Sequence, residues 1–469
     1  GRVDWSLDAR AIGHRLRAKM LICDWRGLTD DFDRIAERIE AGEKASTPFP
    51  ILATPLSAAL QKKCAETYVR DHYPEATMLP RFERRAHDRI RLGYFSADYR
   101  NHPVAHLMAG VFEHHDRTRF EVTAFSLGPS RPDQMRARLE KSFDRFIEIA
   151  TLSDRDVASL ARKHEIDIAI DLTGYTQDSR TGIFAHRAAP IQVNYLGYPG
   201  TMGANYIDYV IADTTLIPEP DRAHYTEKVA YLPDTYQASD SRRRIGSKPF
   251  TRQESHLPDN GLVFACFNTS YKITPDVFAI WMRLLKTFAG SVLWLSQGNE
   301  SAMPNLRREA EACGVDPARL IMAAFVAAPD DHLSRLKLAD LVLDTVPYNA
   351  HASASDALWA GVPVLTCLGN AFPGRVAASL LKAIGLPELI AKDLREYEAL
   401  AHGLCADPTR LQALRESLAT NRLTHPLFVT ARFTRHIEAA YEAMWERHQA
   451  GLAPEHIQAQ AGARRSIGQ

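Results

Sequence analysis

The sequence carries no excess charge of either sign and no long apolar run. Lys and Arg number 57, as do Asp and Glu, in a chain of 469 residues, so it lacks the electrostatic footprint that a nucleic-acid backbone or an anionic bilayer would attract. No apolar run approaches the ~18 residues that predict a membrane span, and the N-terminus is charged, without a secretory hydrophobic region. These absences favour a cytoplasmic protein with no nucleic-acid or membrane partner. Because residue 1 is Gly and not Met, the sequence leaves open what precedes it.

Cysteine is scarce and metal-binding or catalytic signatures are missing. The six cysteines show no C-x-x-C pair or metal-ligand spacing, which in a cytosolic protein predicts reduced, buried thiols. Two Asp-x-Asp strings, beginning at Asp31 and Asp154, lie in helical stretches and not at strand ends, so we expect no metal ion. The sequence has no P-loop, no G-x-G-x-x-G after a strand, no G-x-S-x-G and no H-E-x-x-H. Kinase-like, dehydrogenase, α/β-hydrolase and zinc-peptidase functions therefore lose their main support.

The composition is that of a folded protein with several structural units. Apolar residues make up 45% and charged residues 24% of the chain, an ordinary balance for a globular protein, and roughly 150 residues per domain gives about three units. We expect a helical segment over residues 1–85, with Thr29 as a helix N-cap. Trp25 and Leu28 resemble part of a tetratricopeptide unit, with an ordinary helical hairpin as the alternative.

From about residue 89, short β-rich runs alternate with helical stretches, and the alternation restarts near residue 260. The expected strands are 91–96, 120–126, 166–172, 191–195 and 209–212, then 262–268, 292–296, 320–324, 341–344 and 364–367. Several runs are apolar on both faces, as in a parallel sheet covered by helices. We predict an α/β fold with doubly wound domains at 86–240 and 258–450, a solvated linker at 241–257 and a frayed tail at 451–469. Ligands of such sheets bind beyond the carboxyl ends of the strands, so we expect a site between the domains.

A first candidate cluster, Asp98-Tyr-Arg-Asn101-His102-Pro103, follows a predicted strand. Pro103 suits the first position of a helix, so His102 stands where the strand gives way to a helix. The positive end of the helix dipole disfavours the imidazolium and keeps His102 neutral, as a general base requires. Asp98 is close enough to orient His102 or to act as the base itself. A histidine that only caps the helix is the alternative.

A second cluster, Leu196-Gly197-Tyr198-Pro199-Gly200-Thr201-Met202-Gly203, repeats glycine every three residues. Glycine lets the backbone turn tightly and approach a ligand closely because no Cβ intervenes. A purely structural loop is the alternative.

Two further clusters lead into helices of the second domain. Lys272, just before the helix at Pro275, would carry its charge to the strand ends, where a phosphate could use it; a solvated lysine is the alternative. The segment from Asp344 to Asp356 places small residues at a helix start, where unpaired amides form an anion site that fits a diphosphate. Asp356, one turn in, suits ribose hydroxyls. A plain capped helix is the alternative.

Together these residues resemble the cytosolic O-linked N-acetylglucosamine transferase family, in its compact bacterial form. The resemblance runs from about Leu21 to Trp445 through Ile22-Cys-Asp-Trp25, Asn101-His-Pro103, Leu196-Gly-Tyr-Pro-Gly200, Tyr271-Lys272, Leu358-Trp-Ala-Gly361 and Arg375-Val-Ala-Ala-Ser379. It implies a GT-B fold, two facing Rossmann-like domains after tetratricopeptide helices. It also implies a metal-independent, inverting transfer of N-acetylglucosamine from UDP-N-acetylglucosamine to protein Ser or Thr hydroxyls.

The same resemblance implies roles for single residues. The pyrophosphate is contacted by Lys272 and the amides at Ala352 and Ser353, the uracil by His332 and Arg335, and the ribose by Asp356. The sugar pocket and donor set include His351, Leu196, Gly197, Pro199 and Asn101. The reacting centre is surrounded by His102, Asp98, Tyr271 and Lys272.

The sequence departs from the family pattern at pocket positions. Phe49 stands where animal members have a histidine, and Tyr348 stands where they have a small residue; Ala352 and Ser353 replace two threonines, and Pro329 replaces a lysine. These changes bear on the donor sugar more than on the nucleotide. Two rival functions therefore stay open: the same fold with another nucleotide sugar, such as GDP-fucose or UDP-glucose, and a non-catalytic sugar-nucleotide-binding scaffold. The sequence names neither the acceptor protein nor the oligomeric state.

Overall fold

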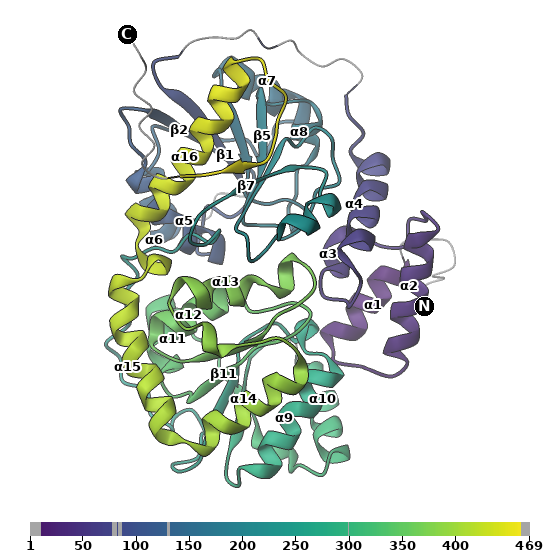
Figure 1. The fold of residues 1–469 in the computed structure, drawn as a ribbon, viewed down its shortest axis with the longest axis vertical. Helices are drawn as coiled ribbons and strands as arrows, with labels where there is room; N and C mark the ends of the chain where they lie inside the picture. Colours follow the sequence, from purple (N-terminus) through teal and green to yellow (C-terminus); the bar gives the residue numbers. More distant parts are fainter. Residues whose placement is uncertain (1–10, 77–81, 83–86, 129–131, 299, 461–469) are drawn as a thin grey trace. The chain divides into compact units, whose positions relative to one another are not determined.

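The computed structural model describes residues 11–76, 82, 87–128, 132–298 and 300–460 (Figure 1). The chain forms two compact units, each built from two stretches of sequence. The first unit comprises residues 1–57 and 243–425, and the second comprises residues 58–242 and 426–469. Sequence reasoning drew continuous ranges, whereas both units are discontinuous. The expected boundary after residue 85 and the last residues of the expected tail, 461–469, lie outside the described residues.

The second unit is built on a parallel sheet. Among the described residues it has eight strands in the order β14-β7-β6-β5-β4-β1-β2-β3. Their bounds are β1 (Ile90–Ser96), β2 (Phe120–Ser126), β3 (Arg145–Glu148), β4 (Ile168–Asp171), β5 (Ile191–Asn194), β6 (Tyr209–Ala212), β7 (Lys228–Tyr231) and β14 (Ile457–Gln458). Chain order reverses between β1 and β4, which are hydrogen-bonded neighbours. Loops that leave the carboxyl ends of these two strands therefore meet at a topological switch point, where ligands of doubly wound sheets bind.

The first unit has its own parallel sheet. The described strands number six, in the order β10-β9-β8-β11-β12-β13. Their bounds are β8 (Val263–Cys266), β9 (Val292–Ser296), β10 (Leu320–Ala323), β11 (Leu341–Leu343), β12 (Val364–Cys367) and β13 (Ile390–Ala391). The switch point lies between β8 and β11, which pair in parallel. The loops that carry Lys272 and Asn349 follow these two strands.

Each unit also contains helices, most of which lie between its strands in the chain. In the second unit they are α4 (Ala58–His72), α5 (Pro103–His114), α6 (Gln134–Glu140), α7 (Asp154–Lys163), α8 (Gly182–Ala185) and α16 (Thr430–Gln449), with 3-10 turns at Glu219–His224 and Pro426–Phe428. In the first unit they are α1 (Ala11–Leu21), α2 (Leu28–Glu40), α3 (Pro48–Ile51), α9 (Pro275–Thr287), α10 (Ala302–Ala312), α11 (Pro329–Leu336), α12 (Ala352–Ala360), α13 (Val376–Ala383), α14 (Leu394–Ala406) and α15 (Pro408–Thr424). Its 3-10 turns are Ser270–Lys272, Pro317–Arg319, Phe372–Gly374 and Pro387–Leu389.

Every strand expected from the sequence is present, and the two parallel sheets confirm the predicted α/β fold. The strands β3, β7, β13 and β14 were not expected. Of these, β3 has polar, exposed ends, and β13 and β14 have two residues each. The tail is not frayed over its described part, because Ile457 and Gln458 pair in parallel with β7.

The helical segment before the first sheet begins with a hairpin of α1 and α2. The expected N-cap Thr29 is wrong, because α2 begins one residue earlier, at Leu28, after Gly27. Gly27 has a φ of 61°, a left-handed conformation that glycine adopts without a Cβ penalty. Trp25 packs edge-on against Phe278 of α9, with ring centroids 5.3 Å apart. The hairpin is thereby joined to the first unit.

The basic stretch expected to be a solvated linker, residues 241–257, is exposed or half-buried over most of its length, but polar contacts hold it at two points. Just before it Gln237, Ser239 and Asp240 are buried, and the Ser241 amide donates a hydrogen bond to Thr430 Oγ1 at 2.8 Å. The charge of Arg243 is not solvated, because this side chain is 10% exposed and pairs with Asp356. Sequence periodicity missed these contacts because polar groups make them.

The final long helix packs as its apolar face predicts. Phe433, Ile437, Tyr441 and Met444 are all buried, and α16 runs alongside α5 in Figure 1. At the end of α5, His115 Nδ1 lies 2.9 Å from Glu438 Oε1. This buried polar contact fixes the position of α16 on its own unit.

The described residues contain neither a membrane-crossing helix nor a cluster of metal-binding side chains. No helix there is both long and apolar enough to cross a bilayer. Within the same residues, His, Cys, Asp and Glu form no group of three or more that is suited to hold a metal ion.

Candidate active site

The loops after β8 and β11 bring two of the sequence-predicted clusters together. Lys272 ends a short 3-10 turn after β8, and its Nζ donates a hydrogen bond to the carbonyl oxygen of Asn349 at 2.9 Å. Asn349 itself lies just before α12. Because β8 and β11 are neighbours at the switch point, the ammonium group and the start of α12 share one edge of the sheet.

Asp344 anchors the loop that leads from β11 to α12. Its buried carboxylate accepts hydrogen bonds from the amides of Thr345 and Ala350, at 2.7 and 2.6 Å, and from Thr366 Oγ1 at 2.6 Å. Burial raises the pKa of Asp344 to about 6, against the effect of these hydrogen bonds. Sequence analysis named Asp344 only as the start of a cluster. In the structure its hydrogen bonds to Thr345 and Ala350 hold both ends of the loop.

The first turn of α12 consists of residues with small side chains, which leaves its backbone amides uncovered. His351 is its N-cap residue and makes no side-chain cap hydrogen bond, so the amides that follow at Ala352 and Ser353 are available to an anion. Ser353 Oγ donates to Asn268 Oδ1 at 2.7 Å. His351 Nε2 lies 3.0 Å from the Pro373 carbonyl. Burial holds the pKa of His351 well below its usual value, and Lys272 lowers it further, so this ring is neutral at pH 7.

The Lys272 ammonium places a positive charge beside the start of α12. Burial lowers the pKa of Lys272 to about 8, while the Asp344 carboxylate favours the charged form. The ammonium also lies over the ring of Tyr348, 3.9 Å from its centroid. Lys272 is therefore held close to α12 and is not the freely solvated lysine of the alternative interpretation.

His332, Arg335 and Asp356 gather beside α12. Arg335 Nε donates to His332 Nδ1 at 3.1 Å, and His332 Nε2 is 4.0 Å from Asp356 Oδ2. Asp356 in turn accepts a hydrogen bond from Arg243 Nη2 at 2.5 Å. Burial lowers the pKa of His332, and Arg335 and Arg243 lower it further, against the pull of Asp356. Sequence reasoning missed Arg243, which carried no local motif.

Tyr271 is part of an aromatic row in the same unit. Its ring meets Phe49 on one side, at 6.3 Å between centroids, and Tyr348 on the other, at 6.1 Å. The guanidinium of Arg17 lies over both Phe49 and Tyr271, at 5.0 and 5.4 Å. The two departures noted in the sequence, Phe49 and Tyr348, thus contact one tyrosine.

In the second unit, His102 stands at the end of the β1 loop, as the sequence predicts. It is the N-cap of α5, with its Nδ1 accepting a hydrogen bond from the Val104 amide at 3.3 Å. The same Nδ1 is 3.4 Å from Asp98 Oδ2, and 34% of the side chain is exposed. Burial and Arg100 lower the pKa of His102, and Asp98 raises it. Asn101, in the same loop, is exposed and its Oδ1 lies 2.7 Å from His106 Nε2.

The glycine cluster lies beside this loop because β5, β4 and β1 are consecutive in the sheet. Leu196 has a φ of 66°, and a Cβ on Gly197 would lie 2.0 Å from the Leu172 carbonyl oxygen. Pro199 is buried. The Ala97 amide donates to Thr173 Oγ1 at 3.1 Å, which joins the loops after β1 and β4. The structure therefore brings the Asp98 and Gly197 clusters to one edge of one sheet.

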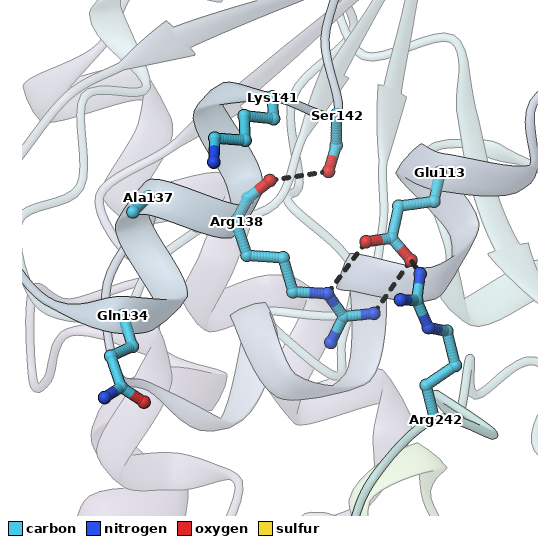
Figure 2. Close-up of a pocket in the computed structure, with 7 residues that line it drawn as sticks. All are labelled: Glu113, Gln134, Ala137, Arg138, Lys141, Ser142 and Arg242. Atoms are coloured by element: carbon cyan, nitrogen blue, oxygen red, sulfur yellow. Dashed lines mark hydrogen bonds and ion pairs between the residues drawn. The ribbon is translucent and has the colours of Figure 1, made fainter.

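A hollow of about 480 Å³ lies between α5 and α6 (Figure 2). Arg138 crosses it and donates to both oxygens of Glu113 at 2.8 Å, and Arg242 Nη1 donates to Glu113 Oε2 at 2.9 Å. None of the sequence-predicted site residues lines it. Arg138 and Arg242 both pair with Glu113 there, which indicates a structural ion-pair network.

Comparisons with known proteins agree with this arrangement. The sequence model of Glycosyl transferase family 41 matches residues 56–248 and 246–437. A protein of Arabidopsis thaliana, named probable UDP-N-acetylglucosamine–peptide N-acetylglucosaminyltransferase SEC, is 37% identical over 418 residues, covering 87% of this chain and 43% of its own. The Caenorhabditis elegans UDP-N-acetylglucosamine–peptide N-acetylglucosaminyltransferase is 26% identical over 568 residues, covering 93% and 49%. This chain spans less than half the length of these two relatives.

A solved structure of a mutant O-GlcNAc transferase from Thermobaculum terrenum aligns with a TM-score of 0.81 at 28% identity. The alignment covers 95% of this chain and 85% of that chain. The two parallel sheets therefore make the GT-B fold that the sequence predicted. The family model covers most of the chain, and the resemblance read from the motifs is confirmed: the chain belongs to glycosyl transferase family 41, the family of the O-GlcNAc transferases.

Proposed function

We propose that this chain is an inverting glycosyltransferase that transfers N-acetylglucosamine from UDP-N-acetylglucosamine to Ser or Thr hydroxyls of proteins. The names of these relatives support the donor and the peptide acceptor. The observation on this chain that carries the proposal is the Lys272 ammonium, held 2.9 Å from the Asn349 carbonyl beside the start of α12. A cation and a row of free amides together match the charge of a nucleoside diphosphate.

In this proposal the first unit binds the donor nucleotide. The diphosphate contacts Lys272 and the amides at Ala352 and Ser353, which neutralise the charge that develops on the leaving UDP without a divalent ion. The uracil contacts His332 and Arg335, and the ribose hydroxyls contact Asp356. Arg243 already pairs with Asp356 and fixes the orientation of its carboxylate.

The second unit supplies the base. When Nδ1 of neutral His102 accepts from the Val104 amide, the ring proton is on Nε2, and neither nitrogen is free to take a proton. When Nδ1 instead donates to Asp98, 3.4 Å away, the Nε2 lone pair is free. Asp98 therefore selects the basic tautomer of His102. The acceptor hydroxyl loses its proton to Nε2 as its oxygen bonds to the anomeric carbon and the bond from that carbon to the UDP oxygen breaks, which inverts the configuration.

The remaining predicted residues belong to the donor set of this proposal. His351, Leu196 and Gly197 are assigned to the sugar pocket, Asn101 and Pro199 to binding of the nucleotide sugar, and Tyr271 to the reacting centre. Phe49 and Tyr348, the two departures from the family pattern noted in the sequence, both pack against Tyr271, so the donor sugar is the part of the proposal that most needs a test. The donor is therefore tested directly, with UDP-glucose and GDP-fucose beside UDP-N-acetylglucosamine.

The test is a transfer assay on the purified chain. We expect UDP release from UDP-N-acetylglucosamine, a peptide that gains one N-acetylhexosamine on Ser or Thr, and a β-anomeric proton in the product, since the donor is the α-anomer. Addition of a chelator is expected to leave the rate unchanged. Stabilisation by GDP and not UDP would replace the proposed donor, and binding of UDP without transfer or hydrolysis would support the non-catalytic scaffold.

A further inference from the structure

Tyr348 is the side chain that meets the Lys272 ammonium face-on. The Lys272 Nζ lies 3.9 Å from the centroid of the Tyr348 ring, and the tyrosine is only 5% exposed. The ammonium also donates a hydrogen bond to the Asn349 carbonyl oxygen at 2.9 Å. Two adjacent residues of one loop therefore hold this cation from two directions.

The Tyr348 ring cannot easily move away from this position. Its backbone carbonyl accepts a hydrogen bond from Thr345 Oγ1 at 2.7 Å, and the loop on both sides of it is anchored on Asp344. The ring is further packed edge-on against Tyr271, and its centroid is 4.8 Å from that of His351. Because the ring is fixed, an ammonium group that lies on its face is held in a fixed position as well.

A ring face suits this role better than a carboxylate. The negative face of an aromatic ring attracts a cation without neutralising it, and it does so more strongly where water is excluded. A carboxylate in direct contact would instead compete with the diphosphate for the same ammonium. When the donor binds, Lys272 must form hydrogen bonds to the diphosphate. An aromatic ring holds the ammonium group in place without using any of its N–H donors, so these stay available to the phosphate oxygens.

We infer that Tyr348 is a positioning residue for the donor site: its ring face holds the Lys272 ammonium beside α12, ready for the diphosphate of the nucleotide sugar. This inference rests on the proposed function, because it takes a nucleoside diphosphate as the ligand. It assigns Tyr348 no contact with the reacting atoms. Its effect on the donor is exerted through Lys272.

The experiment compares ligands with and without phosphate. Tyr348→Leu removes the ring, and Tyr348→Phe keeps it as the matched control. We expect Tyr348→Leu to weaken UDP binding, measured by calorimetry, on the order of tenfold, while uridine binding, measured by ligand-observed NMR, stays unchanged. Tyr348→Phe is expected to retain the affinity of the parent for UDP. Equal losses for UDP and uridine would show a merely structural role and overturn the inference.

A double-mutant cycle tests whether the effect passes through the lysine. In a Lys272→Met background, Tyr348→Leu is expected to add no further loss of UDP affinity. Independent, additive losses would overturn the inference. If Tyr348→Leu does not fold, phenylalanines of increasing fluorination at position 348 keep the shape while they weaken the ring's attraction for cations. UDP affinity is then expected to fall stepwise with fluorination, and a flat response would also overturn it.

The outcomes separate this inference from the proposed function. If the parent protein binds UDP in a Lys272-dependent way, but no Tyr348 variant changes that binding, the inference alone fails. If the parent binds GDP and not UDP, the proposed donor fails instead. In that case the Tyr348 variants are measured against GDP and guanosine, with the same expected difference between the two ligands.

Discussion

Arg243 and Asp356 form an ion pair, with Arg243 Nη2 2.5 Å from Asp356 Oδ1, although 113 residues separate them in the chain. The arginine side chain is 10% exposed and the aspartate side chain 21%. His332 lies on the other oxygen of the same carboxylate, 4.0 Å away. This half-buried ion pair therefore contributes to the charge around His332, which the proposed function assigns to the uracil.

Replacing Arg243 should raise the pKa of His332, because Arg243 is one of the charges that lower it and Asp356 is the charge that raises it. Arg243→Ala is expected to shift the His332 titration upward in NMR, and Asp356→Asn to shift it downward. Loss of the ion pair should also cost about 1 kcal/mol of unfolding free energy, since the partner left behind is not fully buried. Arg242→Ala, the neighbouring exposed arginine that pairs with Glu113, is the control and should leave His332 unchanged.

UDP affinity should fall as pH rises through about 8. Burial lowers the pKa of Lys272 to that value, and only the ammonium form attracts the diphosphate, so binding weakens once the free enzyme loses this proton. Asp344 and Cys266 favour the charged form, and His351 is neutral beside it. Lys272→Arg should flatten the pH dependence, because a guanidinium does not titrate there. Calorimetry from pH 6 to pH 9 is the measurement, and a parent protein with constant affinity over that range contradicts the assignment.

His102→Ala should lower the transfer rate by about 10² to 10⁴ if His102 is the base. Asp98→Asn should lower it as well, because the amide no longer selects the tautomer with a free Nε2. His114→Ala, on the same helix with its Nδ1 on the Gly110 carbonyl, is the matched control. In the parent, the rate should fall on the acid side as His102 takes up a proton, and the lowered pKa places that limb below the usual range for histidine. Full activity of His102→Ala would move the role to Asp98 or to the donor phosphate.

The sequence predicted the strands well because their burial leaves a local signature. β8 is apolar and buried along its whole length, and such a run of apolar residues on both faces can be recognised without knowledge of its neighbours. The short strand β14 gave no such signal, since its pairing depends on β7, more than 200 residues away. The helix starts at Pro103 and Pro275 were predictable because proline favours the first helical position.

The candidate site also contains features that have a local sequence signal and features that do not. Lys272 and the start of α12 were found in the sequence because each carries its own residue pattern. The contacts of Arg243 with Asp356, and of Lys272 with Tyr348, could not be predicted from local pattern, since each joins residues that only the order of strands brings together. Asp344 was visible as a polar residue after a buried strand, but its four hydrogen bonds appear only when the loop is folded around it.

Gly197 should tolerate no side chain, because its position is set by contact with backbone. A Cβ there would lie 2.0 Å from the Leu172 carbonyl oxygen and 3.0 Å from Thr173 Cα, and neither group can rotate away as a side chain could. Gly197→Ala is expected to cost about 1–3 kcal/mol in unfolding free energy and to lower transfer activity at temperatures where the variant stays folded. Gly403→Ala, in the interior of α14 with nothing within 4 Å of the added Cβ, should stabilise the protein by about 0.5–1 kcal/mol. Urea denaturation of both variants beside the parent gives the comparison. A Gly197→Ala protein as stable and active as the parent would show that the loop after β5 shifts freely, and the donor-site role of Leu196 and Gly197 would then lose its geometric basis.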